Sequence, residues 1–242
     1  MALLELTQEI QEAARIDWTA QNPATLNRKD RPKSVRVFTN GFVENVFGKA
    51  HWLTPALWFG PPMVYGLYKG LSDARIGAGR TLGLFALGWV FWTLLEYVLH
   101  RFLFHWEPKQ EKDRIKAFML HGYHHVYHQD KLRLVAPPVM SWVPGILVAL
   151  LYFVVFGRTY FATVFAGTGA GYVAYDWIHY YTHHARPTSG LGKWLRRYHM
   201  IHHFKEHDAC FGVSSPLWDI VFGTYRTPRT ATQNAASEER AA

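Results

Sequence analysis

Four long stretches of this chain carry almost no charge, and they limit what it can fold into more than any other feature. They cover residues 52–67, 81–99, 139–156 and 160–178. A helix needs roughly 20 apolar residues to cross a bilayer core of about 30 Å, and each stretch approaches that length. Trp and Tyr residues near their ends are typical of membrane interfaces. The pattern predicts an all-α integral membrane protein with four transmembrane helices, and buried helices of a soluble bundle are the alternative.

The basic residues predict how these helices are oriented. If the stretches pair as two hairpins, the turns fall near residues 70–80 and 157–159. Of the 26 Lys and Arg residues, only four then lie on the side of the turns: Lys69, Arg75, Arg80 and Arg158. The positive-inside rule makes the opposite side cytoplasmic. The net charge of +8 therefore needs no nucleic-acid partner, and we expect an integral protein of the endoplasmic reticulum or of a bacterial cytoplasmic membrane.

The remaining segments predict a simple domain organisation. Residues 1–50 lack the apolar region of a signal peptide and predict a cytosolic segment. Within it, residues 28–36 suit either anionic lipid head groups or an ordinary solvated loop. Residues 51–226 form the predicted membrane domain, and residues 227–242 predict a disordered tail because they have little to bury. The single cysteine, Cys210, excludes an intramolecular disulfide and a cysteine-based zinc site.

Histidines gather at the predicted cytoplasmic ends of the spans. Thirteen of the fourteen lie from His100 onward, in "HRFLFH" (100–105), "HGYHHVYHQD" (121–130), "HYYTHH" (179–184) and "YHMIHHF" (198–204), followed by His207. Several are three or four residues apart and so share a helix face. Neutral imidazole is a common ligand for Fe, Zn, Cu and Ni. The pattern predicts a shared metal site.

Counting the best-placed imidazoles predicts two ions. The set comprises His100, His105, His121, His124, His125, His179, His183, His199, His202 and His203. One transition metal takes about four to six ligands, so ten imidazoles suit a dinuclear centre.

Some histidines leave alternatives open. His100 and His105 are five residues apart, so either the helix unwinds between them or each serves a different metal. His184 is expected to lie outside the ligand set. His128 and His207 are each four residues beyond a predicted ligand and could join it on spacing alone.

Two acidic residues accompany the clusters. Glu96 lies four residues before His100, and Asp176 lies three residues before His179. Each is placed either to accept a hydrogen bond from the distal nitrogen of a ligand imidazole or to pair with a nearby Arg or Tyr.

The sequence resembles the fatty acid hydroxylase superfamily. The likeness rests on "EYVLHRFLFHW", "HGYHHVYHQDKLRLVAPP", "GYVAYDWIHYYTHHARPT" and "LRRYHMIHHFKEHDACFGVSSPLWDIVFGT", and within the superfamily it is greatest to fatty acid 2-hydroxylases, which act on the acyl chains of sphingolipids. The resemblance implies a cytosolic helical cap over the membrane helices, with a dinuclear iron centre between them. It implies that the ten histidines above are the ligands, that O2 is split there, and that one oxygen atom enters the C–H bond beside the acyl carboxyl carbon. In a purified sample Zn2+ can replace iron.

The chain also departs from the family pattern. Yeast and animal relatives carry an amino-terminal cytochrome b domain, for which residues 1–50 leave no room. We therefore expect a short form that is served by a separate cytochrome b or ferredoxin type electron donor. His128 stands where relatives usually have proline.

Further expectations concern the substrate and the cap. Aromatic residues on the histidine-bearing segments are candidate acyl contacts, or else plain core: Phe102, Phe104, Tyr123, Tyr180, Tyr181 and Phe211. Ser214 or Ser215 is expected to cap a turn before Pro216. The alternatives are a sterol or carotenoid hydroxylase or desaturase of the same superfamily and, from another class, a histidine-rich metal transporter.

Overall fold

The computed structural model describes residues 4–18 and 32–228. This part of the chain is mostly helical, and a single bridge between Leu6 and Phe38 is its only β pairing. The α-helices are α1 (Gln8–Ala13), α3 (Gly41–Phe47), α4 (Thr54–Ser72), α5 (Gly77–Val98), α6 (Glu111–Ala117), α7 (Tyr123–Val126), α8 (Pro138–His184), α9 (Gly190–Phe204) and α10 (Leu217–Val221), and two π-helices are η1 (Leu99–Phe104) and η2 (Phe118–Gly122). The predicted tail lies outside the described residues, apart from 227–228.

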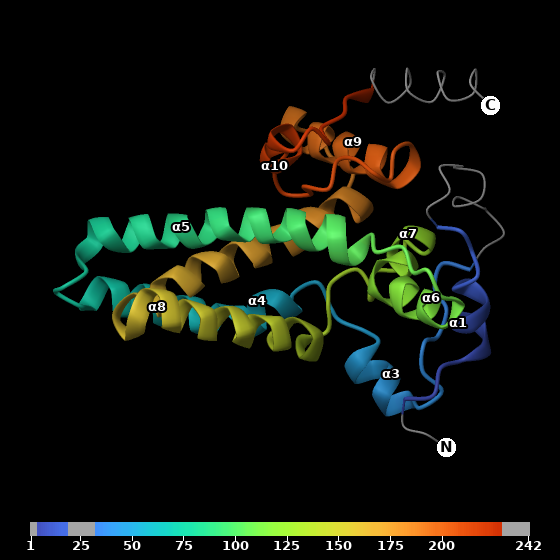
Figure 1. Ribbon diagram of the computed structural model, residues 1–242, viewed down its shortest axis with the longest axis horizontal. Coiled ribbons are helices and arrows are strands. Elements are labelled where there is room, and N and C mark those ends of the chain that lie inside the picture. Colours follow the sequence, from blue (N-terminus) through green and yellow to red (C-terminus); the bar gives the residue numbers. More distant parts are fainter. Residues whose placement is uncertain (1–3, 19–31, 229–242) are drawn as a thin grey trace.

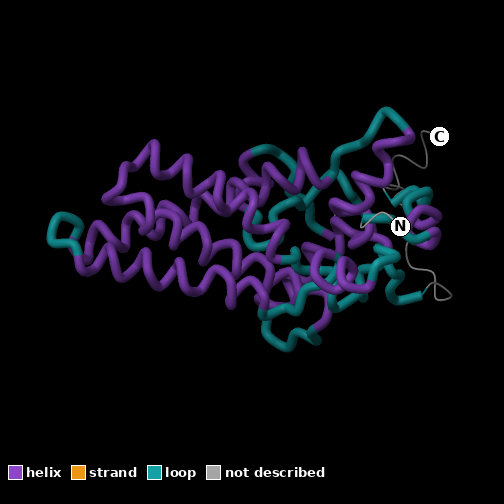
Figure 2. Tube along the Cα trace, turned by 90° about the horizontal axis from the view of Figure 1, so that it is seen from below, coloured by secondary structure: helices purple, strands orange, loops and turns teal. Residues whose placement is uncertain are grey.

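The four apolar stretches are helical, as predicted. The first two form α4 and α5, which are joined by a short turn, and the other two form α8. Helix α8 is two helices that meet at Gly157, where φ is 68° and ψ is 172°. This is a conformation that glycine adopts without steric cost. The two predicted hairpins are therefore present, and their helices run side by side in Figures 1 and 2.

Small residues let α8 lie directly against its neighbours. A Cβ atom at Gly88 would come within 2.0 Å of the carbonyl oxygen of Val164, and one at Gly167 within 1.9 Å of that of Phe85. The hydroxyl of Thr168 donates to the carbonyl of Gly88 at 3.0 Å, which links α5 to α8. Close backbone approach with interhelical hydrogen bonds is how helices pack in membranes, where hydrophobic burial contributes little.

Within residues 4–18 and 32–228, two helical segments are long and apolar enough to cross a bilayer, namely Gly77–Phe104 and Pro138–His184. The outward side chains of the bundle are apolar as well, and they include Leu57, Val64, Leu82, Val143 and Val154. An exposed apolar surface of this kind marks an interaction with lipid or with another protein.

The shorter helices gather at one end of this bundle (Figure 1). There η2 and α7, which follow α6, carry "HGYHH", and α9 carries "YHMIHH". A separate apolar cluster packs residues of the amino-terminal segment, such as Ile10 and Trp18, against Phe118 and Val126. The histidine-bearing helices therefore have their own core beside the bundle.

Candidate metal centre

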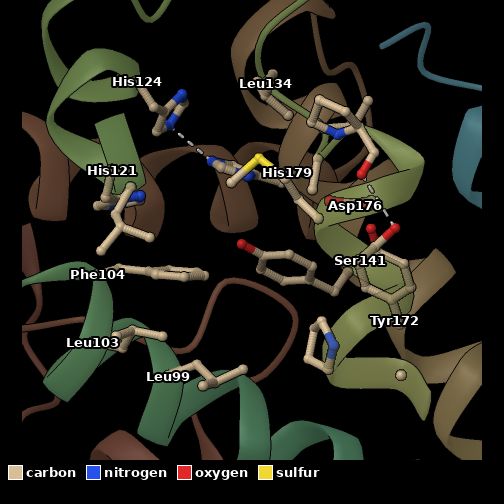
Figure 3. Close-up of a pocket in the computed structure, with 18 of the residues that line it drawn as sticks. Leu99, Leu103, Phe104, His121, His124, Leu134, Ser141, Tyr172, Asp176 and His179 are labelled. Carbon is tan, nitrogen blue, oxygen red and sulfur yellow. Dashed lines mark hydrogen bonds between the residues drawn. The ribbon is translucent and has the colours of Figure 1, made fainter. Parts of the chain in front are cut away.

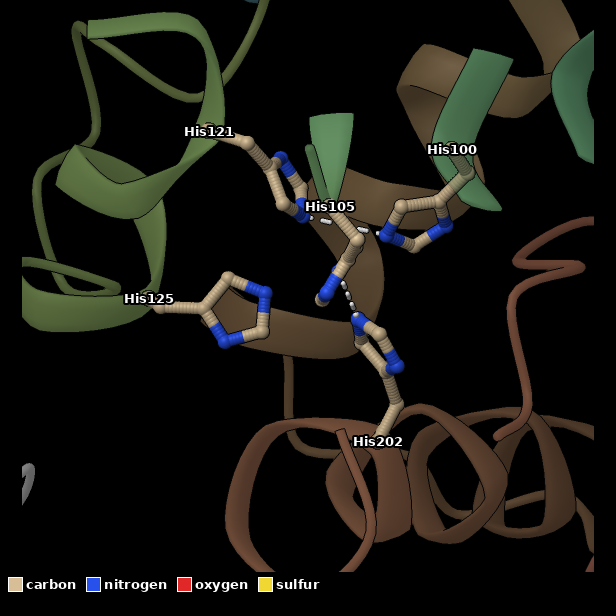
Figure 4. Close-up of side chains that lie close together, drawn as sticks. All are labelled: His100, His105, His121, His125 and His202. Atoms are coloured by element: carbon tan, nitrogen blue, oxygen red, sulfur yellow. Dashed lines mark hydrogen bonds between the residues drawn. The ribbon is translucent and has the colours of Figure 1, made fainter. Parts of the chain in front are cut away.

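The structure gathers the ten predicted histidines into two groups of five. Within each group the ligand nitrogens all lie within 4.8 Å of one another. The first histidine group is His100, His105, His121, His125 and His202, shown in Figure 4, and the second histidine group is His124, His179, His183, His199 and His203. Each group therefore contains five of the ten imidazoles.

Helical spacing explains how the groups are assembled. Histidines four residues apart share a group, as His121 and His125 do in the first and His199 and His203 in the second. The histidine three residues after the start of each trio, His124 or His202, belongs to the other group. Each of these two segments therefore supplies both groups.

A π-helix brings the five-residue pair together. The amide of His105 donates to the carbonyl of His100 at 3.1 Å, the i to i+5 bond of a widened turn in η1. Both side chains then lie in the first histidine group. The first of the two predicted alternatives, a locally unwound helix, is the one that the structure contains.

The nitrogen separations fit a shared ion. Nε2 of His100 is 3.0 Å from Nε2 of His121, and Nε2 of His183 is 2.8 Å from Nε2 of His199. Nitrogens that bind one ion at about 2.0–2.1 Å and at right angles are about 2.9 Å apart. When both facing nitrogens are unprotonated, they have no hydrogen bond to form with each other. A cation between them would accept the lone pairs of both.

Backbone carbonyls set the tautomer of two rings. Nδ1 of His100 donates to the carbonyl of Phe211 at 2.5 Å, and Nδ1 of His202 donates to that of Ala209 at 2.8 Å. The carboxylate of Asp219 accepts the amides of Phe211 and Gly212 at 2.9 and 2.7 Å, which holds this loop in place. With Nδ1 protonated, Nε2 presents its lone pair to the centre of the group.

Burial keeps the rings neutral. It lowers the pKa well below the ordinary value for the seven imidazoles that lie outside the two long apolar segments: His105, His121, His124, His125, His199, His202 and His203. Neighbouring histidines lower it further. Neutral imidazole is the form that binds metal.

Neither acidic residue forms a hydrogen bond with an imidazole in the described part of the chain. Glu96 accepts the amide of Ser214 at 2.8 Å and also its hydroxyl. Asp176 is buried, but Nδ1 of His179 has no hydrogen-bond partner among the described residues. The first of the two alternatives, a carboxylate–imidazole bond, is therefore absent at both residues, and at His100 the carbonyl of Phe211 bonds Nδ1 instead.

The remaining histidines lie outside both groups. The ring of His184 contacts Tyr180 at 4.5 Å, and that of His128 is 6.1 Å from the ring of His183. Nε2 of His207 lies 3.3 Å from a carboxylate oxygen of Asp208, and its ring is 5.2 Å from that of His105. Sequence spacing alone would have allowed His128 and His207 to be metal ligands as well.

An apolar cavity of about 740 Å³ borders the histidines (Figure 3). His121, His124 and His179 are among its polar lining residues, as is Asp176. Most of the lining comes from the helix bundle, including Phe59, Trp92, Leu99, Leu103, Tyr172 and Phe165. Sequence reasoning did not single out most of these, although Tyr172, Asp176 and His179 follow one face of α8 at helical spacing.

The aromatic predictions have mixed outcomes. Phe104 and Tyr123 line the cavity. Phe102 is 64% exposed, and Tyr180 packs on Trp52 and His184. Tyr181 and Phe211 are also not among the residues that line the cavity; the ring of Phe211 packs on three imidazoles instead. The amide of Leu217 donates to the Ser215 hydroxyl at 3.2 Å, which closes a turn around Pro216, whereas the N-cap of α10 is Pro216 itself and has no side-chain cap bond.

Comparison with known proteins agrees with this geometry. A sequence profile described as fatty acid hydroxylase matches residues 85–224. A dihydroceramide fatty acyl 2-hydroxylase of Arabidopsis thaliana is 35% identical over 213 residues, covering 88% of this chain and 86% of the relative. A ceramide very long chain fatty acid hydroxylase of Saccharomyces cerevisiae is 40% identical over 201 residues, or 81% of this chain and 50% of that protein.

A solved structure shows the same arrangement of helices. The structure described as full-length scs7p, in which only the hydroxylase domain is visible, superposes with a TM-score of 0.74 at 29% identity, covering 94% of this chain and 98% of that one. The profile match spans more than half of the sequence. The chain therefore belongs to the fatty acid hydroxylase family.

Proposed function

We propose that this protein hydroxylates the carbon beside the carboxyl carbon of a fatty acyl chain, with the acyl chain of a ceramide or related sphingolipid as substrate. One observation carries the proposal: two buried groups of five imidazole nitrogens border a large apolar cavity. Because the relatives named above are hydroxylases of ceramide or dihydroceramide acyl chains, the substrate class follows theirs.

The metal would be iron, bound by the ten histidines as two ions. Both groups fit such ions, because their rings are neutral and their nitrogens are spaced as ligands of one centre. An unactivated C–H bond needs a redox-active metal, and Zn2+ has no redox chemistry. Bound iron would supply O2 activation: one oxygen atom enters the C–H bond, and the other leaves as water after taking up two electrons and two protons.

The protein itself would position the acyl chain. The apolar walls of the cavity, including Leu99, Leu103 and Phe104, bind methylene groups and exclude water. His121, His124 and His179 lie where the cavity meets the histidine groups, so the reacting carbon belongs at that end. The rest of the acyl chain would extend between α5 and α8 into the bundle.

The bundle would sit in a bilayer as four spans, with the histidine-bearing helices as a cap on the cytoplasmic side. The apolar outer surface of α4, α5 and α8 supports the spans, and the positive-inside rule supports the orientation. A lipid substrate could then enter the cavity from the membrane. Electrons would come from a separate donor of the cytochrome b or ferredoxin type.

Lipid mass spectrometry tests this proposal. The protein is expressed with a cytochrome b type donor and its reductase in a host without 2-hydroxy acyl lipids, alongside the His202→Ala variant. We expect 2-hydroxy acyl lipids from the native sequence and a loss of about 100-fold or more in the variant, because one ligand of the first histidine group is gone. Oxidised sterols or carotenoids instead of 2-hydroxy lipids would refute the proposed substrate, and unchanged lipids with a functioning donor would refute the proposed activity.

A further inference from the structure

The amino-terminal segment covers the first histidine group. The amino-terminal arm, residues 4–18, packs on η2 and α7 through Ile10 and Trp18. The indole of Trp18 is 7% exposed, and its ring centroid lies 5.5 Å from that of His105 and 5.3 Å from that of His125. It also touches the ring of His121 at 6.4 Å. One tryptophan from a distant part of the sequence therefore contacts three of the five rings.

His125 depends on ring contacts for its orientation. Both of its ring nitrogens are buried without a hydrogen-bond partner among the described residues, whereas His100 and His202 each have a carbonyl to hold them. Apart from Trp18, every ring contact recorded for His125 in the described chain is with another histidine. The indole is thus the one aromatic wall of this ring that does not itself belong to a histidine.

Gly122 makes room for the indole. A Cβ atom at Gly122 would lie 2.6 Å from Nε1 and 2.8 Å from Cδ1 of Trp18. The backbone of Gly122 has φ −56° and ψ −35°, which alanine adopts readily in a helix. What excludes a side chain here is therefore the indole, and the glycine in "HGYHH" belongs to the Trp18 contact.

We propose that Trp18 is a positioning residue for the first histidine group, which orients the ring of His125 toward the ion. The inference rests on the proposed metal function. A ligating imidazole is normally held by a hydrogen bond from its second nitrogen to a carbonyl or carboxylate, and loss of such support costs about 10- to 100-fold in metal affinity. For His125, packing by Trp18 takes over this task.

Cobalt binding by the purified, full-length protein tests the proposal without reference to turnover. Metal-free protein is loaded with Co2+, its visible absorption is recorded, and metal release to excess EDTA is followed. For Trp18→Ala we expect an altered spectrum and release of one of the two ions about 10- to 100-fold faster than from the native sequence. Trp18→Phe should restore part of the difference, because phenylalanine keeps an aromatic wall at this position.

A variant of the same arm separates positioning from docking. Ile10 is fully buried in the same apolar cluster, but it is not aromatic and has no part in the ring contacts. Ile10→Ala should lower the unfolding temperature and leave the Co2+ spectrum and both release rates unchanged. If Ile10→Ala reproduces the spectrum of Trp18→Ala, the arm acts only as a whole and the role given to Trp18 is wrong.

Gly122→Ala provides an independent test through a double-mutant cycle. In the native background the new methyl group displaces the indole, so the variant should show the fast release of Trp18→Ala. In the Trp18→Ala background the same change should add nothing, because no indole remains to be displaced. Gly79→Ala, where a Cβ atom meets nothing within 4 Å, serves as the glycine-to-alanine control.

The outcomes distinguish this inference from the function on which it rests. A native protein that binds no Co2+ overturns the metal centre itself. A native protein that binds two ions, with identical spectra and release rates in Trp18→Ala, overturns only the positioning role. Equal effects of Gly122→Ala in both backgrounds would likewise show that Gly122 does not act through Trp18.

Discussion

The carboxylate of Glu96 accepts two hydrogen bonds from Ser214, one from the backbone amide and one from the hydroxyl, across 118 positions of sequence. Glu96 is buried near the end of α5, one turn before His100, and Ser214 lies three residues after Phe211. The pair therefore ties α5 to the loop whose carbonyl orients His100. A buried carboxylate that is not a metal ligand still contributes to the order of the centre.

Loss of the Ser214 hydroxyl should loosen this tie. Ser214→Ala removes one of the two hydrogen bonds and keeps the amide, so we expect the free energy of unfolding to fall by about 1.5–3 kcal/mol, the range for a bond to a charged group. Chemical denaturation in detergent micelles measures it. Ser215→Ala, which removes only the exposed bond from the amide of Leu217, should cost less. An equal loss in both variants would contradict the role given to Glu96.

Removal of one histidine from either group should empty one site and spare the other. For His202→Ala in the first histidine group and His183→Ala in the second, we expect bound iron to fall from about two ions per chain to about one, because four nitrogens of a five-nitrogen set bind more weakly. Elemental analysis of protein purified without oxygen gives the ratio. His51, which is exposed and outside both groups, is the control: His51→Ala should keep both ions.

The accepted acyl length should depend on Phe59. Its side chain lines the cavity near Phe165, which is about 21 Å along α8 from His179. Phe59→Ala should shift the hydroxylated lipids toward longer acyl chains, and Gly145→Val, which fills space beside the ring, toward shorter ones. Lipid mass spectrometry reads both shifts. Leu57 is 70% exposed on the same helix, and Leu57→Ala should leave the distribution unchanged.

Acid should destabilise the metal-free protein. Burial lowers the pKa of the seven imidazoles outside the long apolar segments, so they stay neutral when folded. Between their folded pKa values and about 6.5 the unfolded chain binds more protons, and stability falls as the pH falls. The unfolding temperature should therefore drop from about pH 7.5 to about pH 5.5. Iron-loaded protein should lose its metal over the same range, because protons compete for the ligand nitrogens. A flat profile for the metal-free form would be inconsistent with seven buried neutral rings.

The parts of the centre that could be predicted from the sequence are those set by local helix geometry. His121 with His125, and His199 with His203, share a group because residues four apart share a helix face. Apolar length predicted the helices of the bundle for the same reason, since both properties depend on neighbouring residues. The division of ten histidines into two groups also followed from coordination number alone.

Contacts between segments that are distant in the sequence could not be predicted from it. Glu96 stands one turn before His100, and its spacing predicted a bond either to an imidazole or to a nearby Arg or Tyr, but its partner is Ser214. Trp18 precedes the first ligand by more than 80 positions and belongs to no periodic pattern. The cavity is lined by residues of α4, α5, η1, η2, α7 and α8 and of the loop at 133–137, so a single apolar stripe does not reveal it.

The widened turn at Leu99–Phe104 makes the length of this segment a functional property. In a regular helix the deletion of one residue from "RFLF" would place the second histidine four positions after the first, and both would then share one helix face. Here it would remove the extra residue that the i to i+5 turn contains and rotate everything beyond it by about 100° relative to α5. Substitution of the residues between the two histidines leaves the turn intact, whereas insertion or deletion of a residue there does not.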